Sequence, residues 1–215
     1  MVARAENGAP EGEWLRADWQ TAGRGRMARD WSSPPGNLYA STIVRLRPGD
    51  PPAPTLTLVA AVALHRVAAE FVEARLKWPN DVAVDGRKLS GILLERSGDA
   101  IVAGFGVNLA SHPAIDRPVT SIAALTGKAP DPAAFLAHLA TSLAEMLLVW
   151  RRDLSKIIAL WEAAAHQPGT ALSVDTGAGR RIEGRYLGLT SEGALRLALA
   201  DGSARVIHAG DVFLI

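Results

Sequence analysis

Residues 20–26 of this chain, Gln-Thr-Ala-Gly-Arg-Gly-Arg, combine two glycines with two arginines directly after the apolar segment 14–19. Glycine lets the main chain adopt positive φ and approach a ligand closely. Each guanidinium presents a planar fork of donors that matches a carboxylate or a phosphate. The spacing predicts an anion-binding loop, although a solvated turn has the same composition.

A second group of polar residues follows in the string Lys77-Trp78-Pro79-Asn80-Asp81. Pro79 fixes φ, so the amide of Asn80 and the carboxylate of Asp81 would lie at a rigid strand edge. The next turn, Asp85-Gly86, is typical of a tight hairpin, which would bring Lys88 across from both side chains. An ammonium group there is suited to phosphate charge. The alternatives are a simple turn and a solvated lysine on an edge strand.

A third group lies in the strand-like segment 101–109. Gly104 and Gly106 lower its strand propensity and indicate the close approach of a neighbouring element or a ligand. Asn108 follows with a donor and an acceptor that are able to read a base edge. Taken alone, this segment is also simply a glycine-rich strand.

The elements that position these groups can be read from alternation, helical spacing and turn signals. Strands are expected at 14–19, 38–46, 82–84, 88–95 and 101–109, and helices at 55–75, 131–152 and 155–166. Asp131 and Pro132 are a good N-cap and first helical residue. From Ala171 to Ile215 short strands alternate with glycine turns, so we expect a catalytic unit over 1–168 and a small β-domain over 169–215.

The composition limits the classes of function. The 215 residues are 48% hydrophobic and 21% charged with a formal net charge of +1, which is typical of a globular protein and unfavourable for nucleic-acid binding. Cysteine is absent, so disulfides, thiolate metal sites and a cysteine nucleophile are excluded. We expect no signal peptide, and the most apolar run, 56–69, is too short and too polar to span a bilayer.

In this order and spacing the motifs resemble the catalytic domain of the biotin protein ligases. The resemblance covers residues 20–26, 31–39, 77–81, 88–95 and 104–109, and the tail 171–215 resembles the SH3-like C-terminal domain of that family. It implies an α+β fold: a central mixed sheet packed with helices, of the class II synthetase-like biotin/lipoate ligase type, followed by a small SH3-like β-barrel.

The resemblance also implies a reaction. ATP and biotin would form biotinyl-5′-AMP, which a lysine of a carboxylase carrier domain would then attack. It implies catalytic roles for Lys88 and Arg26. Its implied biotin-binding residues are Gln20, Arg24, Gly25, Arg26 and Lys88, and its implied ATP-binding residues are Arg24, Arg26, Trp31, Asn80, Asp81 and Asn108. Mg²⁺ would accompany ATP without a metal site of the protein's own.

The resemblance further implies a cytoplasmic protein with no DNA or membrane partner. Homodimers are common in the family.

Two departures from the family pattern are present. The Ser-Thr-Asn motif that usually precedes the arginine-glycine loop is missing, so we expect a chain that starts late in its catalytic domain. Met27-Ala28 stands where the family more often has a basic residue and a glycine, so we expect the rate of loop opening and closing to differ.

The rival interpretations are a lipoate ligase or octanoyl transferase, an inactive biotin- or nucleotide-binding module, and a nucleic-acid binder that uses Arg24 and Arg26.

Overall fold

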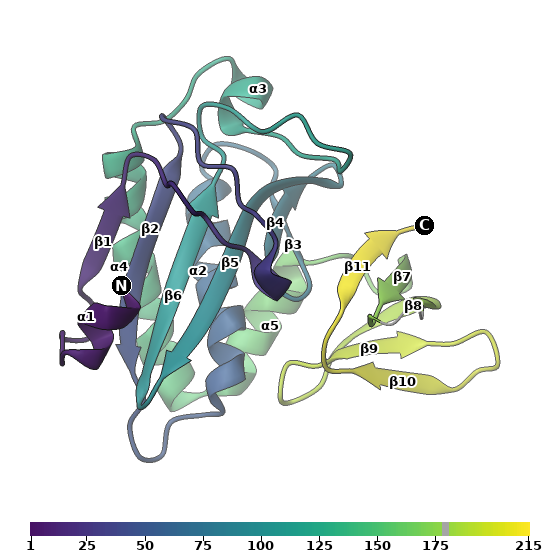
Figure 1. Ribbon diagram of the computed structural model, residues 1–215. Coiled ribbons are helices and arrows are strands. Elements are labelled where there is room, and N and C mark those ends of the chain that lie inside the picture. Colours follow the sequence, from purple (N-terminus) through teal and green to yellow (C-terminus); the bar gives the residue numbers. More distant parts are fainter. Residues whose placement is uncertain (178–180) are drawn as a thin grey trace.

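The computed structural model describes residues 1–177 and 181–215, which form two β-sheets and a layer of helices (Figure 1). The larger sheet has six strands in the order β1-β2-β6-β5-β4-β3. Their bounds are β1 Trp14–Ala17, β2 Leu38–Arg45, β3 Arg75–Lys77, β4 Asp81–Val84, β5 Arg87–Ser97 and β6 Ala100–Val107. The α+β class is confirmed.

The larger sheet is antiparallel rather than mixed in its strand pairs, as far as the described residues go. Hairpins join β3 to β4, β4 to β5 and β5 to β6, and a hairpin imposes antiparallel pairing. Among the described residues, parallel pairing occurs at an isolated bridge between Lys88 and Val119. The expectation of a mixed central sheet is therefore corrected to an antiparallel one.

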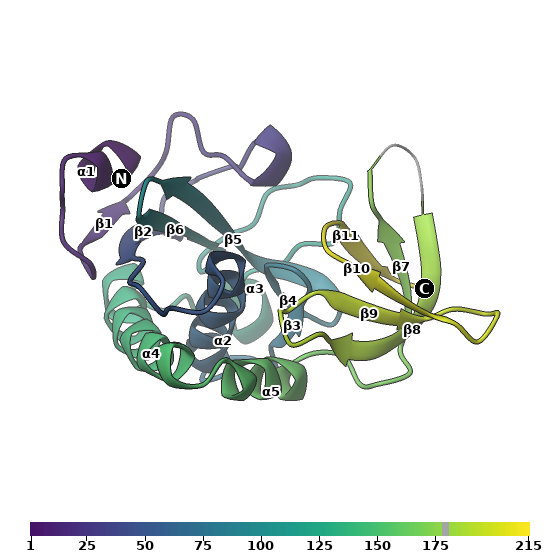
Figure 2. The same ribbon diagram turned by 90° about the horizontal axis from the view of Figure 1, so that it is seen from below.

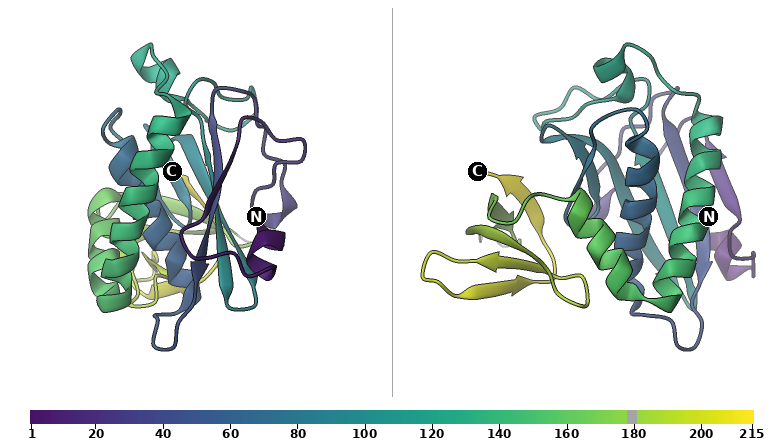
Figure 3. Two further views of the ribbon diagram at one scale, coloured as in Figure 1. Left: turned by 90° about the vertical axis from the view of Figure 1, so that its left-hand side faces the viewer. Right: turned by 180° about the vertical axis from the view of Figure 1, so that it is seen from behind.

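Three helices cover one face of this sheet: α2 Leu56–Ala68, α4 Pro132–Arg152 and α5 Leu154–Ala164. The loop with the 3-10 turn η1 Arg26–Ala28 lies over the other face (Figure 2). Seen from behind, α4 and α5 flank α2 (Figure 3). The short elements α1 Val2–Glu6, η2 Ala53–Thr55 and α3 Ile122–Thr126 complete the set. One face of the sheet is thus packed with helices and the other carries the loop.

Helix α4 begins as its sequence predicts. The Asp131 carboxylate accepts a hydrogen bond from the Ala134 amide, and Pro132 is the first helical residue. The helix has the length and apolar composition of a membrane span, but its buried residues pack against α2 and the sheet. Trp150 near its end is fully buried, and its Nε1–H donates to Thr55 Oγ1 at 2.7 Å. This helix is therefore a core helix.

Helix α2 is shorter than predicted. It ends at Ala68 instead of continuing to Arg75, and residues 75–77 form strand β3. No glycine or proline separates the two elements, so the sequence contains no stop signal there. Pairing of β3 with β4 and the stacking of Phe71 on Phe135, with ring centroids 5.9 Å apart, override the local helix propensity.

The smaller sheet has five antiparallel strands in the order β10-β9-β8-β7-β11. Their bounds are β7 Ala171–Asp175, β8 Arg181–Leu189, β9 Leu195–Ala198, β10 Ala204–Ile207 and β11 Asp211–Leu214. The smaller sheet is joined to the rest of the chain by polar contacts as well as by a continuous apolar core. Trp78 Nε1 donates to the Gly193 carbonyl at 3.1 Å, and the Leu189 amide donates to Glu162 at 2.6 Å.

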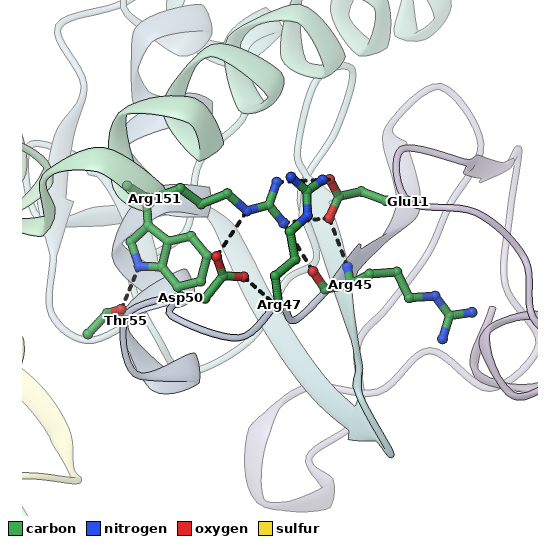
Figure 4. A network of polar contacts seen from close by, with 7 residues as sticks. Glu11, Arg45, Arg47, Asp50, Thr55 and Arg151 are labelled. Atoms are coloured by element: carbon green, nitrogen blue, oxygen red, sulfur yellow. Dashed lines mark hydrogen bonds and ion pairs between the residues drawn. The ribbon is translucent and has the colours of Figure 1, made fainter.

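A charged network fastens the N-terminal segment to the end of α4 (Figure 4). Arg151 donates to both carboxylate oxygens of Glu11, at 2.9 and 2.7 Å, and through Nε to Asp50 at 3.3 Å. Arg47 donates to Glu11 at 2.7 Å from the other side. Because Arg151 and Asp50 are largely withdrawn from solvent, we interpret this network as a structural clamp.

Candidate active site

The arginine-glycine loop is closed by its own backbone. The Trp31 amide donates to the Gly23 carbonyl at 3.0 Å, and the Gly25 amide donates to the Arg29 carbonyl at 2.7 Å. At the tip, Met27 and Ala28 both have positive φ, 55° and 56°. Side chains disfavour this conformation, so the loop tip is strained where the family would have a glycine.

A pair of glycines forms the floor beneath Trp31. Gly91 on β5 and Gly106 on β6 are direct cross-strand partners, and the indole lies across both. A Cβ on Gly106 would lie 2.5 Å from Cε2 of Trp31, and one on Gly91 would lie 3.1 Å from its Cζ3. The indole Nε1 is buried and, among the described residues, has no hydrogen-bond partner. A flat, open stretch of sheet thus accommodates an aromatic ring.

Lys88 lies at the edge of this floor. Its Nζ is 2.6 Å from Oδ1 of Asp81 and 5.5 Å from the centre of the Trp31 ring. The Asp85-Gly86 turn, with φ values of 49° and 74°, forms the hairpin that brings β5 back along β4. The predicted juxtaposition of Lys88 and Asp81 is therefore confirmed as geometry.

Arg26 approaches the same place from the loop. Its Nη1 donates to Oδ1 of Asn80 at 3.1 Å. Asn80 is buried, with only 8% of the residue exposed, and its Nδ2 donates to the Ile92 carbonyl at 2.5 Å. This buried and hydrogen-bonded amide therefore orients Arg26. The peptide bond between Trp78 and Pro79, just before Asn80, is cis.

The electrostatics of the site favour anions. Burial lowers the pKa of Lys77, and the cations Lys88 and Arg117 lower it further, while Asp81 and Asp211 oppose the shift. Arg26 and Arg29 add two further guanidinium groups near Asp211. Several cations thus share two carboxylates, which leaves positive charge available to a bound anion.

The predicted site residues divide into two groups. The structure brings five of them together beside the β4–β5 hairpin: Arg26, Trp31, Asn80, Asp81 and Lys88. The others lie outside this cluster in the present conformation. The roles of both groups stay predictions.

Each of these others has a different local environment. Gln20 accepts a hydrogen bond from Ser33 Oγ at 2.8 Å. Arg24 is largely exposed and lies 3.9 Å from Glu95. Gly25, at the base of the loop, lies near the Arg29 carbonyl. The side-chain amide of Asn108 is buried, and its Nδ2 donates to the Thr120 carbonyl at 3.0 Å, so this side chain anchors the segment after β6.

Sequence reasoning missed Arg29 and Asp211 and did not single out Lys77 within its motif. Asp211 lies 182 residues from Arg29 along the chain, so no spacing rule could connect them. The glycine floor did have a signal, because Gly106 interrupts a strand and predicts close approach. No cluster of three or more His, Cys, Asp or Glu side chains able to hold a metal ion occurs in the described part of the chain.

Family comparison places this fold and site in a known class. Residues 7–109 match the model of the biotin/lipoate A/B protein ligase family, and residues 174–215 match that of the biotin protein ligase C-terminal domain. The cationic cluster on the open sheet face belongs to the first region, and Asp211 belongs to the second. The fold and the site thus define a ligase of the biotin/lipoate type.

Individual relatives narrow the class. A biotin--[acetyl-CoA-carboxylase] ligase from Paracoccus denitrificans is 36% identical over 93% of this chain and 89% of its own length. A biotin protein ligase from Aquifex aeolicus, solved with biotin and ATP, superposes with a TM-score of 0.86 at 28% identity, covering 99% of this chain and 93% of that one. One from Leishmania major, solved with biotinyl-5-AMP, gives 0.66 at 27% identity over 97% and 94%. The chain belongs to the biotin protein ligases.

Proposed function

We propose that this protein activates biotin with ATP and transfers it to a lysine of a carboxylase carrier domain. In the first step a biotin carboxylate oxygen bonds to the α-phosphorus of ATP and pyrophosphate leaves, which gives biotinyl-5′-AMP. In the second step the lysine amine bonds to the acyl carbon, AMP leaves, and the amine loses a proton. The names and ligands of the relatives support both substrates.

The observation that carries the proposal is the position of Lys88 beside Asp81 and Trp31 above the Gly91–Gly106 floor. The first step brings two anions together, the biotin carboxylate and the α-phosphate. Fixed cations lower that barrier because they stabilise the charge that builds up on the phosphoryl oxygens. Lys88 on a rigid hairpin and Arg26 held by Asn80 are cations of this kind, so we assign them the catalytic roles.

The remaining roles follow the same proposal. Gln20, Arg24 and Gly25 would line the biotin side together with Arg26 and Lys88. Trp31, Asn80, Asp81 and Asn108 would contact the nucleotide together with the loop arginines. The division at residues 168 and 169 into a catalytic unit and a small β-domain is part of the same proposal.

Mg²⁺ fits this site as a companion of the nucleotide. Mg²⁺ commonly binds one or two carboxylates and takes its other ligands from substrate phosphates and water. Asp81 is the carboxylate of the cluster that would lie beside the ion, and the ion would neutralise phosphate charge. Asp81 already pairs with Lys88, so the negative charge of its carboxylate would be shared between Lys88 and the magnesium ion.

The test is the exchange of labelled pyrophosphate into ATP, measured with each candidate carboxylic acid substrate in turn. We expect exchange with biotin and none above background with lipoate or octanoate. Exchange with lipoate or octanoate alone would replace the proposal with the rival ligase interpretation. Binding of biotin without exchange would favour the inactive binding module.

A further inference from the structure

Two arginines of the loop contact a carboxylate of the smaller sheet. Arg29 Nη1 is 2.8 Å from Oδ2 of Asp211, and its Nη2 donates to Oδ1 at 3.2 Å. Arg26 Nη1 lies 3.7 Å from Oδ1 of Asp211 and 3.5 Å from the Gly210 carbonyl. The fork of Arg29 thus grips Asp211 with both arms, which is the strong geometry for such a pair.

The carboxylate projects from a rigid part of the smaller sheet. Asp211 begins β11 and pairs with Asp175 on β7. A Cβ on Gly210 would lie 2.8 Å from the Asp175 carbonyl oxygen and 2.8 Å from Val174 Cγ1. The backbone before Asp211 is therefore pressed against β7, and the carboxylate has little freedom to follow the loop.

The loop has few other restraints of this kind. Met27 at its tip is 75% exposed, and both Met27 and Ala28 have the positive φ that side chains disfavour. A conformation of this kind persists only where surrounding contacts hold it. Within the described part of the chain, the polar contacts that reach Arg26 of η1 from outside the loop come from Asn80, Gly210 and Asp211.

The charge state of Asp211 agrees with this geometry. Burial alone would raise the pKa of its carboxyl group, but the hydrogen bond from Arg29 and the charges of Arg29, Arg26 and Lys88 outweigh burial and lower it. Asp211 is therefore an anion whose charge is oriented toward the loop arginines.

We propose that Asp211 is a positioning residue that latches the arginine-glycine loop over the Lys88 site through Arg29 and so keeps Arg26 directed at Asn80. The consequence for the reaction rests on the proposed function: a latched loop retains biotinyl-5′-AMP until the acceptor lysine arrives. The smaller sheet thereby contributes to the site by holding the loop, without touching the reacting atoms.

The variant Asp211→Asn tests the latch because it keeps the shape of the side chain and removes its charge. In the ligand-free full-length protein, we expect tryptic cleavage after Arg24 and Arg26 to accelerate by about 3- to 10-fold, as suits a partly exposed bidentate pair. With biotin and ATP, we expect a similar rise in the labelling of lysines on an unrelated protein. Asp201→Asn, in the β9–β10 turn of the same sheet, is the matched control, since within the described residues the Asp201 carboxylate accepts hydrogen bonds only from Ser203.

A double-mutant cycle with Arg29→Gln completes the test. If the latch exists, each single variant opens the loop and the double variant opens it no further. Cleavage and labelling at wild-type levels in folded Asp211→Asn would overturn the latch. Where Asp211→Asn does not fold, Arg29→Gln alone gives the same comparison from the loop side. A wild-type protein that forms no biotinyl-5′-AMP would refute the proposed function, while the cleavage rates would still decide the latch.

Discussion

The indole of Trp31 lies so close to Gly106 that a single methyl group would not fit between them, since a Cβ there would be 2.5 Å from Cε2. Gly91, the cross-strand partner of Gly106, likewise leaves room for the indole, since a Cβ on Gly91 would lie 3.1 Å from Cζ3 of Trp31. Two glycines on adjacent strands therefore give Trp31 a flat bed on an otherwise occupied sheet face. Trp31 in turn lies under the ammonium of Lys88.

Gly106→Ala is expected to displace Trp31. Overpacking costs about 1–3 kcal/mol, so the affinity of a site that includes this indole would fall by about 5- to 150-fold. Gly104→Ala, two residues earlier on β6, is the matched control, because its Cβ would meet Ser41 Oγ at 3.5 Å and the Leu93 carbonyl at 3.6 Å, which are ordinary contacts. Calorimetric titration with biotin and with ATP measures both variants. Equal affinities for the two variants would exclude Trp31 from the site.

Lys88→Ala is expected to slow adenylate formation by on the order of 10²-fold, since a fixed cation no longer meets the charge that develops on phosphorus. Single-turnover formation of biotinyl-5′-AMP is the measurement, with thermal unfolding as a check of the fold. Lys128→Ala removes an exposed lysine after α3 and should leave the rate unchanged. A Lys88→Ala protein that is as fast as the control would remove Lys88 from the chemistry.

Arg151→Ala is expected to destabilise the protein by about 2–4 kcal/mol, because it leaves the carboxylates of Glu11 and Asp50 without their shared partner. Arg152→Ala, exposed at the next position, should change the free energy of unfolding by less than about 0.5 kcal/mol. Urea unfolding of both variants gives the comparison. Similar values for the two variants would mean that the network contributes little.

The same network predicts a dependence on acid. Burial would raise the pKa of Glu11, but Arg151, Arg45 and Arg47 outweigh burial and hold it below the ordinary value of 4.5. The unfolded chain then binds protons at a higher pH than the folded one, so the stabilisation is complete above pH 4.5 and is lost as pH falls through the lowered value. In Arg151→Ala the loss of stability at low pH should be smaller than in the wild type. The same dependence of unfolding free energy on pH in both proteins would contradict this prediction.

His65 predicts a second loss of stability at milder pH. Burial lowers its pKa from 6.5, although the hydrogen bond of 3.0 Å between Nε2 and the Ala74 carbonyl partly opposes the shift. A lowered pKa gives stability that is full above 6.5 and is lost as pH falls through the value in the folded protein. His65→Gln should flatten the slope of unfolding free energy below that pH, while the exposed control His112→Gln should retain the wild-type slope.

Local sequence rules predicted much of the site because its parts lie in short, regular segments. The Asp85-Gly86 turn fixed the β4–β5 hairpin, and with it the approach of Lys88 to Asp81. Asp131 and Pro132 fixed the start of α4. In each case the controlling residues are neighbours along the chain, so their geometry follows from backbone preferences alone.

The rest depends on contacts between distant segments. Asp211 meets Arg29 only because the smaller sheet docks against the larger one, and no periodicity encodes that arrangement. The end of α2 at Ala68 has the same origin, since pairing of β3 with β4 replaces a helix that local propensity would continue. Asn108 shows a further limit: its type suits a ligand contact, yet its amide is committed to Thr120 in this conformation.

The proposed activity is tested by the mass of a carrier domain after incubation with this protein, ATP, Mg²⁺ and an equimolar mixture of biotin and lipoate. We expect one added biotinyl group on the target lysine, none on a carrier with that lysine replaced by arginine, and none without ATP. A lipoyl group in its place, or an unmodified carrier after prolonged incubation with folded protein, would contradict it.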